Sequence, residues 1–124
     1  MIPKISEAEW RVMRLFWQKS PRTANDIVDK LEGITNWNRQ TIRTMINRLV
    51  QKGALSFEKD GREYQYYPLV KEAECQKMEF KSFIKRVYNG ALQPIIVTFL
   101  EETNISDEEI ENLEKLLEEK RRKK

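Results

Sequence analysis

The sequence predicts a mainly α-helical protein that carries one small β-hairpin. Apolar residues recur along most of the 124-residue chain at i, i+3, i+4 and i+7, the spacing of an amphipathic helix. The helical spacing of apolar residues is lost only between residues 54 and 67. There Asp60-Gly61 stands between two short runs of residues that favour β-strands. The length of 124 residues predicts one compact domain or two small units that share a core. With 40% hydrophobic and 35% charged residues, the chain has the composition of a globular protein.

The first predicted helix begins at Ser6, because Ser6-Glu7-Ala8-Glu9 has the S-x-x-E form of a capping box. This helix ends before Pro21, and its apolar face holds Trp10, Val12, Met13, Phe16 and Trp17. A second helix is predicted over residues 24–32, with Thr23 as its N-cap and Gly33 as its stop.

Asn38 is the predicted N-cap of a third helix over residues 39–52, which ends at Gly53. Its buried stripe consists of Ile42, Met45, Ile46, Leu49 and Val50. Two strands follow over residues 54–58 and 62–67, and Lys59-Asp60-Gly61 joins them, since the turn needs a positive φ at the glycine. Three helices and a hairpin with short links form a winged helix-turn-helix, in which the third helix is the recognition helix and the hairpin is the wing.

Three more amphipathic helices are predicted after Pro68. The first ends at Asn89-Gly90, and Ser106 opens the last with a second capping box. Their stripes hold more apolar side chains than about 50 residues can bury alone, so we expect a second copy of the chain to cover them. Residues 1–70 are then the winged helix and residues 71–124 a three-helix dimerisation module. The predicted dimerisation residues are Phe80, Phe83, Ile84, Val87, Leu92, Ile95, Ile96, Phe99, Leu100, Ile110, Leu113 and Leu117.

The composition excludes several classes of function. The chain has no histidine, which removes the commonest metal ligand and the usual acid–base group at neutral pH, so neither a metal, a cofactor nor catalysis is expected. Cys75 stands alone and cannot form an internal disulfide, which indicates a cytoplasmic protein. No apolar run is long enough to span a membrane.

The third helix carries the residues best suited to contact DNA. Residues 1–70 hold 12 basic and 8 acidic side chains, and no acid occurs between Gly33 and Glu58. Opposite the buried stripe lie residue types that read base edges in a major groove: Gln40, Arg43, Thr44 and Asn47. The predicted phosphate contacts come from this helix and the tip of the wing: Arg39, Thr41, Arg48, Lys59 and Arg62. The alternative interpretation of these polar residues is an ordinary solvated surface.

The aromatic residues have a structural interpretation. Tyr64, Tyr66 and Tyr67 are placed where a base-stacking platform could form, but residues in such positions usually pack a wing against its helices. Trp10, Trp17 and Trp37 are expected to anchor the core or its loops.

Motifs along the whole chain resemble those of the penicillinase-repressor family of the BlaI, MecI and CopY type. The resemblance rests on Ile5-Ser6-Glu7-Ala8-Glu9-Trp10, Thr23-Ala24-Asn25-Asp26-Ile27-Val28, Trp37-Asn38, Thr41-Ile42-Arg43-Thr44, Asn47-Arg48-Leu49, Lys52-Gly53-Ala54-Leu55 and Gly61-Arg62-Glu63-Tyr64. It implies a homodimeric transcriptional repressor that binds palindromic operator DNA in front of genes for β-lactam resistance or copper homeostasis.

Two departures from the family pattern concern how the repressor is released. The copper-responsive branch has paired C-x-C motifs, whereas Cys75 is single here, so metal sensing is disfavoured. The antibiotic-responsive branch is cleaved through a sensor-linked metallopeptidase at an Asn-Phe bond, and the matching bond here is Thr98-Phe99. The rival interpretations of the whole chain are a winged-helix adaptor that docks proteins and, third, a non-specific chromosome-binding protein.

Overall fold

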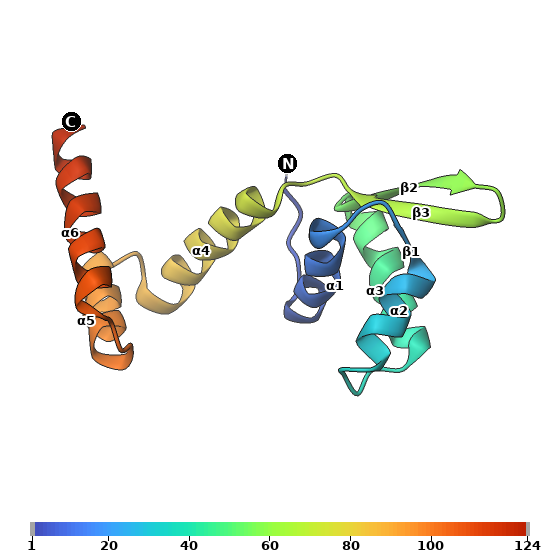
Figure 1. The fold of residues 1–124 in the computed structure, drawn as a ribbon, viewed down its shortest axis with the longest axis horizontal. Coiled ribbons are helices and arrows are strands. Elements are labelled where there is room, and N and C mark those ends of the chain that lie inside the picture. The colour runs from blue at the N-terminus through green and yellow to red at the C-terminus, as the bar shows by residue number, and fades with distance from the viewer. Residues whose placement is uncertain (1, 124) are drawn as a thin grey trace. The chain divides into compact units, whose positions relative to one another are not determined.

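The computed structural model describes residues 2–123, and their packing divides the chain into two units, Met1–Glu79 and Phe80–Lys124 (Figure 1). The first unit contains α1 (Glu7–Gln18), β1 (Arg22–Thr23), α2 (Ala24–Glu32), α3 (Arg39–Lys52), β2 (Leu55–Asp60) and β3 (Glu63–Pro68). Helix α4 (Glu72–Tyr88) begins in the first unit and continues into the second, which also holds α5 (Leu92–Glu102) and α6 (Asp107–Arg122). Among residues 2–123, none of the helices has the length and hydropathy that a membrane-spanning segment requires.

The predicted helix ends of the first unit are confirmed. The Ser6 hydroxyl accepts a hydrogen bond from the Glu9 amide at 3.2 Å, and the Glu9 carboxylate accepts one from the Ser6 amide at 2.9 Å, which completes the capping box. The side chains of Thr23 and Asn38 cap α2 and α3 in the same way. Gly53 ends α3 with a φ of +87°, a left-handed conformation that residues with a Cβ rarely adopt.

The core of the first unit lies where α1, α2 and α3 face one another. The fully buried side chains come from all three helices and include Val12, Met13, Phe16, Ile27, Val28, Leu31, Ile42, Ile46 and Leu49. Burying each large apolar side chain is worth about 1.5–3 kcal/mol relative to leaving it exposed. The three tryptophans lie at the margin of this core, as expected of anchors, and the indole of Trp17 donates to the Val70 carbonyl at 3.0 Å.

The sheet differs from the prediction in two respects. It has three antiparallel strands in the order β1-β3-β2, and β1 was missed because two residues are too few to show a period. The predicted ends of the hairpin were also wrong, since β2 continues through Asp60, which pairs with Glu63. Gly61, at φ +67°, and Arg62 therefore form a two-residue turn, because the glycine alone supplies the left-handed conformation.

Contacts place the first turns of α4 with the winged helix. Cys75 is 2% exposed and belongs to the core of the first unit, so the two units separate after Glu79 and not after Val70. The predicted end of this helix is confirmed, since Asn89 and Gly90 both have positive φ.

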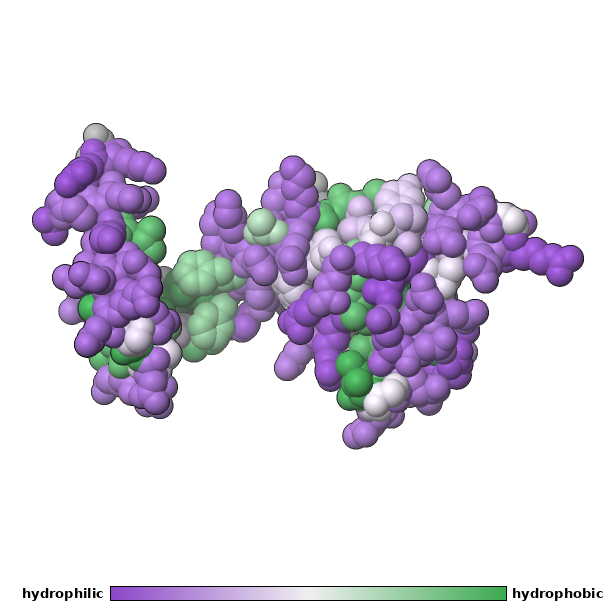
Figure 2. Space-filling view, viewed as in Figure 1, coloured by the Kyte–Doolittle hydropathy of each residue, from purple (hydrophilic) through white to green (hydrophobic). Residues whose placement is uncertain are grey.

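The second unit leaves its apolar stripes uncovered in the single chain. Among residues 80–123 no side chain is buried, and the exposed fractions of Phe80, Leu92, Leu116 and Leu117 are 60%, 66%, 60% and 71%. Apolar side chains show at the surface of this unit in Figure 2. Uncovered apolar stripes on this scale are typical of an interaction surface.

Candidate nucleic-acid interface

Helix α3 presents the four predicted base-reading side chains on its solvent side. The buried residues of α3 include Ile42, Met45, Ile46 and Leu49. Because they lie on one face of the helix, the opposite face is directed toward solvent. Gln40, Thr44 and Asn47 are exposed, whereas Arg43 is half-buried at the edge of the same face. The structure therefore brings these residues together on one polar surface.

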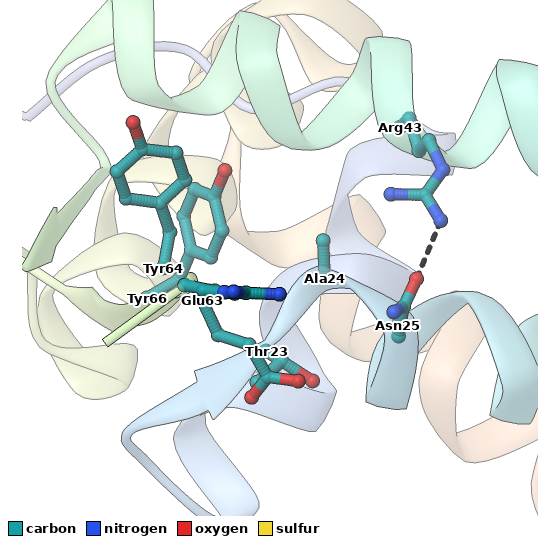
Figure 3. A pocket seen from close by; sticks show the side chains of 8 residues that line it. Thr23, Ala24, Asn25, Arg43, Glu63, Tyr64 and Tyr66 are labelled. Atoms are coloured by element: carbon teal, nitrogen blue, oxygen red, sulfur yellow. Dashed lines mark hydrogen bonds between the residues drawn. The ribbon is translucent and has the colours of Figure 1, made fainter. Parts of the chain in front are cut away.

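Arg43 lies where the beginning of α2, helix α3 and the wing meet (Figure 3). Its Nη2 donates a hydrogen bond to Oδ1 of Asn25 at 2.5 Å. The two side chains border a shallow depression of about 190 Å³, which is also lined by Thr23, Ala24, Arg62, Glu63, Tyr64 and Tyr66. Sequence reasoning missed the role of Asn25, because the residue lies 18 positions from Arg43 and only the tertiary fold brings them together.

The charge of Arg43 also affects the wing. Burial raises the pKa of the Tyr66 phenol and the neighbouring Tyr64 raises it further, while Arg43 acts in the opposite direction. The side chains of Arg43 and Tyr66 line the same depression, although they come from α3 and β3.

Arg39, a predicted phosphate contact, is engaged within the protein. Its Nη1 lies 3.1 Å from Oδ1 of Asp29 and 3.2 Å from Oε1 of Glu32, both on α2. The hydrogen bond to Asp29, followed by that to Glu32, raises the pKa of Arg39 despite an opposing effect of burial. The acid-free run in the sequence is thus not an acid-free surface, since α2 brings two carboxylates to the start of α3.

The remaining predicted phosphate contacts are accessible. Thr41 and Arg48 are exposed on α3. Lys59 is exposed on β2 and Arg62 is exposed in the turn of the wing. None of these four side chains takes part in an ion pair that the structure describes. They can therefore contact DNA phosphates without breaking such a pair.

An ion pair between the buried Glu9 and the partly exposed Lys52 joins the end of α3 to the start of α1. The Glu9 carboxylate is inaccessible to solvent, and its Oε1 lies 2.5 Å from Nζ of Lys52, which also donates to the Lys4 carbonyl at 3.0 Å. Burial alone would raise the pKa of Glu9, but hydrogen bonds from Lys52 and Ser6, together with the lysine charge, hold it below its usual value. The sequence identified Glu9 only as part of a capping box.

Three aromatic side chains of the wing, Phe57, Tyr64 and Tyr66, form one cluster, whereas Tyr67 lines a separate depression beside Pro21 and Lys59. Phe57 lies 5.0 Å from Tyr64 and 5.5 Å from Tyr66 between ring centroids, and Tyr66 lies 6.3 Å from Phe16 of α1. Tyr66 therefore packs the wing against the core, as the structural interpretation predicts. Phe57, which the sequence analysis did not single out, is 43% exposed and Tyr64 is 47% exposed.

Three comparisons relate the chain to known proteins. A family model described as the penicillinase repressor matches residues 5–119. The penicillinase repressor of Bacillus licheniformis is 39% identical over 123 residues, which cover 99% of this chain and 96% of that protein. The methicillin resistance regulatory protein MecI of Mammaliicoccus sciuri is 38% identical over 94% of this chain and 95% of its own length. A solution structure of monomeric Bacillus licheniformis BlaI in complex with the blaP half-operator has a TM-score of 0.54 and 39% identity, over 60% of this chain and 90% of that one.

Proposed function

This chain belongs to the penicillinase-repressor family, whose members are transcriptional repressors and not enzymes, and from that premise we propose that it binds a palindromic operator as a homodimer. The proposal rests on the polar face of α3, because this helix and the wing belong to the same unit. A related domain with 39% identity is known in complex with a half-operator. The genes it controls are of the β-lactam-resistance type, as for the relatives.

In the proposed complex, α3 enters the major groove and the wing lies along the backbone. Gln40, Arg43, Thr44 and Asn47 contact base edges, because amide, guanidinium and methyl groups match adenine, guanine and thymine. Phosphates are contacted by Arg39, Thr41, Arg48, Lys59 and Arg62. For Arg39 this contact competes with Asp29 and Glu32, so its contribution to affinity is smaller than that of a free arginine.

The proposed partner of the second unit is a second copy of the chain. The apolar stripes of α4, α5 and α6 are exposed in one copy, and two copies related by a two-fold axis cover the same stripes on each other. Two linked winged helices then bind two half-sites, and the second half-site binds at a high effective concentration. This proposal explains why a palindromic operator is expected.

The proposed release mechanism is cleavage of α5 between Thr98 and Phe99 by a sensor-linked metallopeptidase in the cytoplasm. Phe99 is 45% exposed in the single chain and belongs to the proposed dimer surface. A protease therefore reaches this bond after local opening, and cleavage of the intact dimer is slow. The cut removes the avidity of two linked half-sites.

The function is tested by selecting sequences from a random duplex library with the full-length chain, followed by fluorescence anisotropy on the selected duplex and a scrambled one. We expect a palindromic consensus and much tighter binding of the selected duplex. Arg43→Ala should weaken this binding by about 1–3 kcal/mol and relax preference at one base pair per half-site, whereas Lys115→Ala on α6 is the control. Equal affinity for both duplexes would indicate non-specific binding, and no affinity for either would favour a protein-docking adaptor.

A further inference from the structure

We propose that Asn25 is a positioning residue for base reading: its side-chain amide holds the guanidinium of Arg43 in the orientation that selects a base. This inference rests on the proposed DNA-binding function and assigns a role to a residue outside the recognition helix. Figure 3 shows the two side chains pointing toward one another, with the Nη2 to Oδ1 hydrogen bond of 2.5 Å between them.

The position of Asn25 is fixed by the elements around it. Asn25 is the second residue of α2, directly after Ala24, and the Thr23 side chain caps this helix by accepting from the Asp26 amide at 3.2 Å. Thr23 also pairs with Gln65 of β3, so the start of α2 is attached to the wing. The acceptor that meets Arg43 is therefore held by both α2 and the sheet.

Arg43 differs from the other base-reading candidates because it is half-buried. Its guanidinium borders the depression between α2, α3 and the wing, with Tyr64 and Tyr66 on the wing side. A guanidinium carries five N–H donors, and the contact with Asn25 uses one of them. The remaining donors keep the planar fork that bonds guanine in bidentate fashion.

Asparagine is suited to this task because it orients the arginine without neutralising it. Arg39, four residues earlier, shows the contrasting arrangement, since two carboxylates hold it as an ion pair. Glu63 is the acidic residue among those that line the same depression as Arg43, so it is a competing acceptor by charge. Without Asn25, the guanidinium is free to turn toward Glu63 and away from the polar face of α3.

The test compares Asn25→Ala and Asn25→Asp by selection from a random duplex library and by anisotropy on every single-base variant of the selected duplex. Asn25→Ala should lower discrimination at the base pair read by Arg43 by about threefold to tenfold, the factor that one hydrogen bond of ordinary net strength supports. Asn25→Asp keeps the acceptor oxygen but adds a negative charge, so it should retain that discrimination while binding all duplexes more weakly.

Two further variants separate positioning from a general structural effect. In an Arg43→Ala background, Asn25→Ala should cause no additional loss of discrimination at that base pair, because the group that it positions is gone. Asn112→Ala on α6 is the matched control and should leave both affinity and discrimination unchanged. Thermal unfolding of each variant verifies that the winged helix is folded.

The outcomes distinguish this inference from the proposed function. If the unmodified chain selects a palindrome and Asn25→Ala leaves every base preference unchanged, Asn25 does not position Arg43 although the repressor function stands. If Asn25→Asp loses discrimination as fully as Asn25→Ala, the acceptor oxygen is not what matters, and the inference is overturned. If the unmodified chain selects no sequence, the proposed function itself fails.

Discussion

Lys52→Met removes the positive half of the partly buried ion pair between α3 and α1 and leaves the buried Glu9 carboxylate with the Ser6 amide as its remaining partner. Breaking a buried pair from one side destabilises a protein by about 3–5 kcal/mol, because an uncompensated charge stays in the interior. The Lys52 side chain is 30% exposed and therefore partly solvated. We accordingly expect a loss of about 2–3 kcal/mol in the free energy of unfolding at pH 7.

Tryptophan fluorescence is the appropriate assay, because Trp10, Trp17 and Trp37 all lie in the first unit and report on its unfolding alone. For a unit of this size, the expected loss lowers the midpoint of thermal unfolding by about 10–20 °C. Lys30→Met, at an exposed lysine of α2, is the control and should stay within about 0.5 kcal/mol of the unmodified chain.

The pH dependence provides an independent measurement. The folded-state pKa of Glu9 is lowered, so its ionisation stabilises the fold above the ordinary carboxyl pKa, and this stabilisation is lost as the pH falls through the folded-state value. In Lys52→Met, burial should raise the pKa of Glu9 instead. The difference in stability between the two proteins should therefore shrink between pH 7 and about pH 4.

A second substitution decides whether the charge is responsible. Glu9→Gln in the Lys52→Met background keeps an acceptor for the Ser6 amide but removes the uncompensated charge, so it should recover most of the lost stability. If Lys52→Met matches the Lys30→Met control, or if the double variant is no more stable than Lys52→Met, the ion pair does not hold α3 to α1.

The remaining predictions concern DNA binding and assembly. Lys59→Ala should weaken binding to all duplexes about equally and reduce the slope of log affinity against log salt by about one unit, measured by anisotropy over a salt series. Asp29→Asn should tighten DNA binding by up to about fivefold, because it removes one of the two carboxylates that engage Arg39; unchanged affinity would show that Arg39 does not contact DNA. Leu113→Glu should convert a dimer to a monomer in sedimentation at tens of micromolar, and a monomeric unmodified chain would contradict the proposed assembly. Exposure of the native host to a β-lactam should produce fragments 1–98 and 99–124 by mass spectrometry, whereas an intact chain with derepressed genes would exclude cleavage.

The features that the sequence predicts best are those with local causes. The caps at Ser6, Thr23 and Asn38 and the stop at Gly53 depend on hydrogen bonds or backbone conformations within a few residues, and all four are confirmed. The exposed face of α3 follows equally directly from the period of its buried residues.

The features that the sequence did not reveal depend on contacts between distant segments. Strand β1 exists because β3 lies beside it, and Arg22 alone shows no preference that would predict this pairing. The partners of Arg43 and Arg39 lie 18 and 7 to 10 residues away, and those of Lys52 lie 43 and 48 residues away, so no spacing rule indicates them. The turn of the wing was displaced because Asp-Gly is the commoner centre of such turns, whereas Gly61 here occupies the first central position.

The pairing of β1 with β3 has a consequence for the thermodynamics of DNA recognition. A two-stranded hairpin that is attached only at its base keeps much of its conformational freedom, and that freedom is lost when the hairpin is fixed against a ligand. Here Arg22 pairs with Tyr66 and Thr23 pairs with Gln65, so the wing has a third strand and already shares a fixed register with the start of α2. Part of the wing's conformational entropy is therefore lost during folding and not during association, because the strand around Gln65 and Tyr66 is ordered before DNA binds.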